Sequence, residues 1–179
     1  MNKVDPSRVY RLFYPAVPAV VSCNDRGLVY SMPVVSIIPL SNDPATIGFA
    51  SSPQHATHVA ISQVRSFSVC WLDSSKVEAV KVLGSTGHTA PDKLKAAGLP
   101  HSRGKTLDVP IVEGSAAALE CTLYHRQVIG DHELVIGKVQ AAWAIDDFQE
   151  YWKFERYRPL LYTGLQGGAL GTHSAPGLD

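Results

Sequence analysis

Residues 17–36, VPAVVSCNDRGLVYSMPVVS, carry the pattern that decides the fold of this chain. Two runs rich in valine flank Asp25-Arg26-Gly27, where aspartate and glycine favour a turn. Apolar, β-branched runs separated in this way predict two antiparallel strands joined as a β-hairpin. Pro33 falls inside the second run, and because proline has no N–H to donate, we predict a break or bulge there.

The same alternation of apolar runs and turn residues recurs along the chain and predicts mainly β structure with short helices. Further strands are predicted at residues 46–50, 66–72, 118–129 and 132–145. Short helices are predicted at residues 5–12, within 51–64, at 76–84 and at 91–97. In the first long strand Leu119, Cys121 and Leu123 alternate with Glu120 and its polar neighbours, which is typical of a half-buried strand. Strands joined as hairpins indicate a closed antiparallel barrel rather than a βαβ sheet.

Length and composition indicate one globular domain. The 179 residues are enough to bury a sizeable core, and 45% of them are hydrophobic against 18% charged. We predict a single domain over residues 1–165 and a flexible C-terminal tail over residues 166–179, because the tail is rich in glycine and lacks a periodic pattern.

Charge and hydropathy argue against nucleic-acid and membrane partners. Sixteen basic residues balance sixteen acidic ones, so the positive excess of a nucleic-acid binder is missing. No apolar run approaches the roughly 20 residues needed to span a bilayer. The N-terminus also lacks the apolar core of a secretory signal. We therefore expect a soluble, cytoplasmic protein.

Metal and nucleophile motifs are missing from the sequence. Cys23, Cys70 and Cys121 lie far apart in apolar surroundings, so we expect buried, reduced thiols rather than a zinc or redox site. His55 and His58 could share one face of a helix, but no nearby cysteine or carboxylate completes a ligand set, so no metal site is predicted. There is no GxGxxG, Walker A, HExxH or GxSxG motif.

Four segments in order resemble the flavin reductase-like family of FMN-binding split barrels, which includes flavoredoxins and small archaeal ferric reductases. They are PAVVSCNDRGLVYSMPVVSIIPLSNDPATIGFAS, SSPQHATHVAI, APDKLKAAGL with VPIVEGSAAALEC, and GDHELVIGKV. In the first, the matching positions are Val20, Val21, Gly27, Met32, Ser36, Ser41, Asp43 and Pro44. The resemblance implies an antiparallel, Greek-key-like split β-barrel that binds FMN as its cofactor.

The second segment is similar to the phosphate-side loop of the family. A phosphate dianion is best held by hydroxyls and backbone N–H groups at a helix N-terminus, where the helix dipole adds favourable charge. Ser51, Ser52 and Thr57 supply such hydroxyls around Pro53, and His55 stands where an arginine is usual. The alternative is that these are ordinary loop and N-cap residues.

The isoalloxazine ring requires an apolar slot and backbone groups released from strand pairing. The candidates are Met32, Pro33, Val34, Val35 and Ser36. The alternative interpretation is a buried strand kinked by its proline. Lys93 matches a lysine of the third family segment, although a surface lysine on a helix would give the same sequence.

His132 is the candidate for the residue that meets NAD(P)H during catalysis. It lies at the tip of the last predicted hairpin, where a histidine is more often an exposed turn residue. The resemblance places that corner of the fold beside the flavin or the incoming nicotinamide. We expect His132 to orient the nucleotide, while the cofactor supplies the redox chemistry.

The resemblance also implies a two-fold homodimer with FMN near the subunit interface. The aromatic stretch at residues 151–157, YWKFERY, is a candidate for that interface, and a surface helix with one apolar face is the alternative. The expected activity is that of an NAD(P)H-dependent flavin reductase passing electrons to a small-molecule or protein acceptor. A flavoredoxin-like carrier without a nucleotide site and a non-redox ligand-binding barrel are the alternatives.

Overall fold

The hairpin predicted at residues 17–36 is present. β1 (Ala19–Asp25) pairs antiparallel with β2 (Leu28–Val34). Arg26 and Gly27 form the turn, and both have positive φ values, 52° and 88°. These values fit a two-residue type I′ turn, whose twist matches that of the paired strands. The computed structural model describes residues 1–85, 92–166 and 169–174, and within it this hairpin lies at one end of the main sheet.

Pro33 does not interrupt β2, so the predicted break at this residue is wrong. Its Cα lies opposite that of Val20, and the register between the two strands continues without a shift. β2 is the outermost strand in the sheet order, where a missing N–H leaves no ladder hydrogen bond unmade. The backbone leaves the strand two residues later, at Val35 and Ser36.

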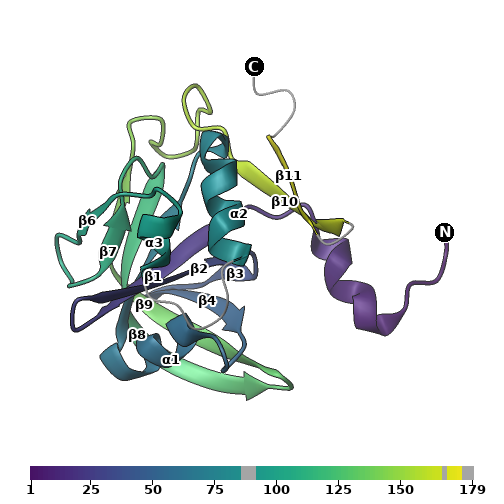
Figure 1. Ribbon diagram of the computed structural model, residues 1–179, viewed down its shortest axis with the longest axis horizontal. Coiled ribbons are helices and arrows are strands. Elements are labelled where there is room, and N and C mark those ends of the chain that lie inside the picture. The colour runs from purple at the N-terminus through teal and green to yellow at the C-terminus, as the bar shows by residue number, and fades with distance from the viewer. Residues whose placement is uncertain (86–91, 167–168, 175–179) are drawn as a thin grey trace.

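Seven antiparallel strands form the main sheet in the order β2-β1-β5-β8-β9-β4-β3 (Figure 1). The other five strands are β3 (Ile37–Asn42), β4 (Ala45–Ser51), β5 (Ser66–Trp71), β8 (Ala117–Ile129) and β9 (His132–Ala144). Val21, Phe49, Phe67 and Val135 belong to the largest buried cluster of the core. The predicted mainly β, antiparallel architecture is confirmed.

β1 is apolar on both faces because both faces are covered. Val21 belongs to the largest cluster, whereas Val20 packs in a second cluster with Leu83 of α2 (Val77–Ser85) and Leu94 of α3 (Lys93–Ala96). Figure 1 shows these two helices on the same side of the sheet. A strand buried on two faces has a continuous apolar sequence rather than an alternating one. All three cysteines are buried in these clusters, as predicted.

The remaining short elements follow local sequence signals. They are η1 (Pro6–Phe13), α1 (Ala56–Val64), η2 (Ser74–Lys76), β6 (His101–Arg103) and β7 (Pro110–Val112). The predicted N-cap Asp5 accepts a hydrogen bond from the N–H of Ser7 at 2.8 Å, although η1 has 3-10 rather than α geometry. The predicted helix start at residue 91 lies outside the described residues. No helix in the described ranges is long and apolar enough to cross a bilayer.

Glu120 departs from the alternation predicted for the first long strand. The register of β8 against β9 shifts between Glu120 and Cys121, so two successive residues turn away from solvent. Both are fully buried, at 0% relative exposure. A β-bulge of this kind has no signature in the apolar pattern.

The N-terminal and C-terminal segments project together from the sheet (Figure 1). β10 (Leu160–Gln166) and β11 (Ala169–Ser174) form a hairpin, and Ala16 exchanges two backbone hydrogen bonds with Tyr162 of β10, at 3.0 and 2.8 Å. Residues 169–174 were predicted as part of a flexible tail. In the structure they form β11, which pairs antiparallel with β10. The glycines of this segment had favoured a tail over a strand in the prediction. Residues 167–168 and 175–179 lie outside the described residues.

Candidate functional site

A cavity of about 680 Å³ opens where β2 leaves the sheet. This volume falls within the range of small-molecule sites, about 300–1,000 Å³. Eight residues predicted to bind the cofactor or nucleotide line it: Met32, Pro33, Val34, Val35, Ser36, Ser51, His55 and His132. The structure therefore brings most of the predicted site together, from three separate segments of the sequence.

Sheet pairing explains how these segments meet. Ser51, at the end of β4, pairs with Glu133 of β9, which places the tip of the β8–β9 hairpin beside the start of α1. The break after β2 is held by Ser36, whose hydroxyl donates to the carbonyl of Ala50 at 3.0 Å and accepts from its N–H at 3.1 Å. The residues after β2 are thereby fixed against the end of β4.

The N-terminus of α1 lies at this cavity. His55 is the N-cap residue, and its side chain makes no capping hydrogen bond to the first turn. Its Nδ1 atom lies 3.4 Å from the Ser51 hydroxyl. A helix start whose N–H groups are left uncapped by the side chain suits an anionic ligand, because the dipole and the N–H donors act together.

Four predicted site residues do not line the cavity. Thr57 is buried in the first turn of α1, with 3% relative exposure. The Ser52 hydroxyl accepts from the N–H of Gln54 at 3.4 Å, and Pro53 lies between them. Lys93 is buried in α3, where burial lowers its pKa. Ser52, Pro53 and Thr57 are one or two residues in sequence from Ser51 or His55, which line the cavity. Lys93 belongs to a different element, α3.

His132 lies at the rim of the cavity and is held by its neighbour. Its Nδ1 atom lies 2.9 Å from Oδ1 of Asp131, and 47% of the histidine side chain is exposed. The hydrogen bond from His132 lowers the pKa of Asp131. A carboxylate bound at Nδ1 fixes the orientation of the ring and leaves Nε2 for a ligand.

Five lining residues were not predicted from the sequence: Ser7, Tyr10, Tyr14, Ala50 and Asp131. Tyr10 and Tyr14 come from η1 and its C-cap, and the ring of Tyr14 packs edge-on against Tyr162, with 4.8 Å between centroids. The spacing of the two tyrosines predicts a shared helical face. It does not say that this helix returns to the cavity, which depends on pairing with β10.

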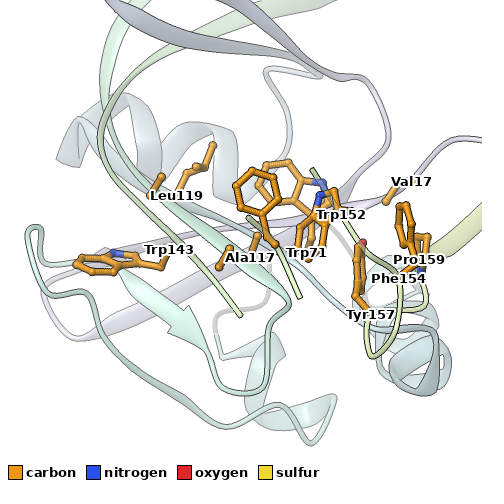
Figure 2. A pocket seen from close by; sticks show the side chains of 12 residues that line it. Val17, Trp71, Ala117, Leu119, Trp143, Trp152, Phe154, Tyr157 and Pro159 are labelled. Atoms are coloured by element: carbon orange, nitrogen blue, oxygen red, sulfur yellow. The ribbon is translucent and has the colours of Figure 1, made fainter. Parts of the chain in front are cut away.

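A second cavity of about 530 Å³ is walled by aromatic side chains (Figure 2). It lies between β8, β9 and the segment after β9, and Trp143 stands apart from the other rings. The YWKFERY stretch is irregular here, so the alternative of a surface helix is wrong. Rings of this stretch contact one another, with Trp152 4.7 Å from Tyr157.

The irregular segment is held by a buried carboxylate. Asp147 accepts the N–H of Glu155 at 3.1 Å and that of Tyr157 at 3.0 Å. Phe154 has a positive φ of 57°, which a bulky residue adopts only when its surroundings impose it. Burial raises the pKa of Tyr157 to about 12. The backbone that carries these aromatic rings is therefore fixed by specific hydrogen bonds to Asp147.

Comparison with known proteins identifies the architecture. Residues 10–164 match the family model described as flavin reductase like domain. The chain is 32% identical to an FMN-binding protein from Thermus thermophilus whose structure holds 1-cyclohex-2-enone; the TM-score is 0.78, covering 96% of this chain and 94% of that one. This similarity confirms the predicted split-barrel fold.

Two relatives found by sequence are similar to this chain over most of its length. A flavin reductase from Pseudomonas putida is 30% identical, over 71% of this chain and 72% of its own length. An uncharacterized protein from Aeropyrum pernix is 30% identical over 92% of this chain. The match spans 63% of the Aeropyrum protein, so that relative contains sequence beyond the shared domain.

Proposed function

This chain belongs to the flavin reductase-like domain family, and we propose that it is an oxidoreductase that binds FMN in the cavity beside β2. The observation that supports this proposal best is the convergence of the 32–36 segment, the uncapped start of α1 and His132 on one cavity. Each of the three suits a different part of a flavin nucleotide. The 32–36 segment offers an apolar wall for the ring, the start of α1 offers an anion site for the phosphate, and His132 lies at a polar rim.

The start of α1 fits the phosphate. Its N–H groups face the cavity end at which Ser51 and His55 lie, and the helix dipole favours negative charge there. In our proposal Ser51 and His55 contact the phosphate directly, and Ser52 and Thr57 shape the loop and the first turn. His55 replaces the arginine usual in the family, so the charge of this site depends on the protonation of an imidazole.

The wall formed by residues 32–36 fits the ring system. Met32 is buried and its sulfur lies 3.8 Å from the Ser51 hydroxyl, while the backbone at Val35 and Ser36 is outside strand pairing. That arrangement offers apolar contact together with free backbone donors and acceptors. Bound FMN would supply hydride and electron chemistry that no side chain provides. The protein's own part is to hold the ring and to exclude water from it.

At the rim, we propose that His132 binds and orients NAD(P)H. Asp131 fixes the imidazole through Nδ1, so that Nε2 is presented to an incoming ligand. In this proposal His132 has a binding role only, because bound FMN would supply the redox chemistry and no protein acid or base is required of it.

The test is FMN binding followed by reduction. FMN at 100 times its Kd should stabilise the fold by about 2.7 kcal/mol and raise the Tm by about 5–10 °C, with a smaller shift from riboflavin. Anaerobic NADH or NADPH should then bleach the flavin absorbance. An unchanged Tm with FMN would remove the flavin assignment. Bleaching by dithionite but by neither nucleotide would favour the flavoredoxin-like carrier.

We also propose a homodimer whose subunits pack along an apolar strip. The aromatic cavity shares Val17 and Trp71 with a neighbouring hollow beside β3, and that hollow shares Val35 with the flavin cavity. On the projecting N-terminal segment, η1 has no buried residue, and Leu12 and Phe13 are 63% and 76% exposed. Two unmatched apolar surfaces on one chain suit mutual burial by a second copy, the η1 of one subunit lying on the strip of the other.

Charge on η1 should therefore separate the subunits. We expect the wild-type chain to elute as a dimer in size-exclusion chromatography with light scattering, and Leu12→Glu with Phe13→Glu to give a monomer. Arg8→Glu, on the same helix, is the matched control and should leave the dimer intact. A wild-type monomer at micromolar concentration would contradict the proposal, as would a double variant that stays dimeric.

A further inference from the structure

The outer half of β8 has no neighbouring strand on one of its two sides. β5 pairs with β8 only as far as Thr122, whereas β9 pairs with β8 as far as Ile129. Leu123 still donates its N–H to the carbonyl of Arg65, at 2.8 Å. In the described chain, no backbone hydrogen bond joins residues 124–129 to any segment other than β9. We call residues 124–129 the open edge.

The open edge is long and regular enough to receive another strand. The register shift of β8 lies between Leu123 and His125, and from His125 to Ile129 the pairing with β9 is regular. The open edge extends over roughly 20 Å. All of its residues are exposed. Because unpaired N–H and C=O groups bind other strands, most sheet edges are short, covered or bulged, and an exposed, regular edge is a binding surface for an extended chain.

A groove of about 300 Å³ follows this edge. Five of its seven lining residues lie at positions 123–128, and Arg65 and Glu133 complete it. When an extended chain adds to a sheet edge, its successive side chains point to opposite faces of the sheet. Every second side chain of a strand bound here would therefore meet the groove.

The charges of the groove favour acidic side chains. Arg65 and Arg126 bring two guanidinium groups, and both residues are exposed. The carboxylate that lines the groove, that of Glu133, already has partners: its Oε2 lies 3.4 Å from Nη1 of Arg126 and 3.1 Å from Nε2 of His58. Guanidinium groups bind carboxylates through paired N–H donors. A carboxylate on an incoming strand would therefore find a complementary charge here.

The far end of the open edge is apolar. Val128 and Ile129 are 65% and 60% exposed, and they are β-branched residues that suit contact with another strand. Ile129 pairs with His132 across the turn of the hairpin, and His132 lines the proposed flavin cavity. A strand bound along the open edge would therefore end close to the rim of that cavity.

A second copy of this chain is a poor occupant of the open edge. Suppose that two copies pair antiparallel with both grooves on the same face of the joined sheet. Their Arg126 side chains would then lie directly or diagonally opposite each other. Like charges in such positions destabilise paired strands, whereas opposite charges stabilise them. The charge of the edge thus selects an acidic partner over itself.

From these observations we propose that the open edge binds an extended, acidic segment of a partner protein as an added β-strand. Its carboxylates would lie in the groove beside Arg65 and Arg126, and its apolar side chains would contact Val128 and Ile129. Main-chain hydrogen bonds would supply affinity, and the groove would select the sequence. The proposal goes beyond the flavin chemistry and requires no bound flavin.

The test uses a short fluorescein-labelled peptide that alternates glutamate and valine, and a matched peptide with lysine in place of glutamate. Fluorescence anisotropy measures binding to the whole chain, with and without FMN. We expect saturable binding of the acidic peptide in both states and at least tenfold weaker binding of the lysine peptide. Arg126→Glu should weaken the acidic peptide at least tenfold. Lys138→Glu makes the same charge change on β9, which is paired on both sides, and should change the affinity less than twofold.

Two further measurements keep the test independent of local folding. Arg126 also contacts Ser62 and Glu133, so His125→Glu introduces the charge in the same groove without removing those contacts. It should weaken the acidic peptide at least threefold. Amide hydrogen exchange reports the strand itself, because alternate residues of a paired strand direct their N–H groups to the same neighbour. The peptide should slow exchange at alternate positions of the open edge.

Each contrary outcome overturns the docking proposal and leaves the flavin assignment in place. These outcomes are no binding of the acidic peptide, equal binding of the lysine peptide, or unchanged affinity in both Arg126→Glu and His125→Glu. Binding without slowed exchange would mean charge attraction and no added strand. Conversion of a dimer to a monomer by Arg126→Glu would assign the edge to a second copy of the chain. Failure to bind FMN would remove the flavin assignment alone.

Discussion

Replacing Glu120 by alanine is expected to lower the free energy of unfolding by about 3–5 kcal/mol, because the change removes a buried, charged acceptor that four N–H donors share. The fully buried carboxylate accepts the backbone N–H groups of Lys105, Thr106 and Leu107 at 3.0, 2.9 and 2.6 Å. It also accepts the indole N–H of Trp143 at 2.9 Å. One side chain therefore holds the 104–107 loop and a wall of the aromatic cavity.

A glycine allows the 104–107 loop to approach the Glu120 carboxylate closely. A Cβ at Gly104 would lie 2.6 Å from Oε2 of Glu120 and 2.7 Å from the carbonyl oxygen of Leu107, so only glycine permits the approach. Lys105 then places its ammonium 4.2 Å from the ring centroid of Trp143. Urea unfolding, followed by tryptophan fluorescence, measures the loss. Glu113→Gln, at an exposed glutamate, is the control and should cost less than about 0.5 kcal/mol.

The contribution of Glu120 should also depend on pH. Burial alone would raise the pKa of Glu120, but hydrogen bonds from Leu107, Trp143, Thr106 and Lys105 outweigh it and hold the pKa below the usual value. A carboxylate with a lowered pKa in the folded state stabilises fully above its unfolded pKa, about 4.3, and loses that effect as the pH falls through the folded value. The gap between wild type and Glu120→Gln should therefore shrink in acid. A constant gap would contradict this account.

Short-range features of the fold were predictable because they depend on neighbouring residues. The β1–β2 turn requires positive φ at Arg26 and Gly27. The segment Asp25-Arg26-Gly27 predicts such a turn, because aspartate and glycine are frequent in tight hairpin turns. Pro33 and Glu120 misled the prediction because their outcome depends on distant partners: the position of β2 at the sheet edge, and a loop that is 13 to 15 residues from Glu120. In a central strand Pro33 would have interrupted the pairing, and in a regular ladder Glu120 would have faced solvent, as predicted.

The candidate site divides in the same way. Residues 32–36 could be predicted because they are contiguous and lie in a segment that resembles the family. Tyr10 and Tyr14 could not, because they reach the cavity only through the pairing of Ala16 with Tyr162, almost a whole chain length apart. The aromatic wall was visible as YWKFERY, but its shape depends on Asp147 and on the positive φ of Phe154.

The largest expected change in cofactor affinity comes from His55→Asp. Aspartate is among the best N-cap residues, so its carboxylate should bond the first-turn N–H groups that the His55 side chain leaves uncapped, and the fold should be as stable or more so. The same carboxylate would occupy the proposed phosphate site and repel a dianion. At about 4 Å and an effective dielectric constant near 20, that repulsion is worth up to about 4 kcal/mol per pair of unit charges.

We therefore expect His55→Asp to weaken FMN at least 100-fold while riboflavin affinity changes less than threefold and the Tm does not fall. His55→Asn has the same shape and caps equally well without the charge, so its FMN affinity should stay within about tenfold of the wild type. Fluorescence titration and thermal unfolding provide the measurements. Equal losses of FMN and riboflavin in the aspartate variant would place the phosphate elsewhere. Equal FMN losses in the two variants would assign the effect to the lost imidazole instead of the added charge, because only charge distinguishes the substitutions.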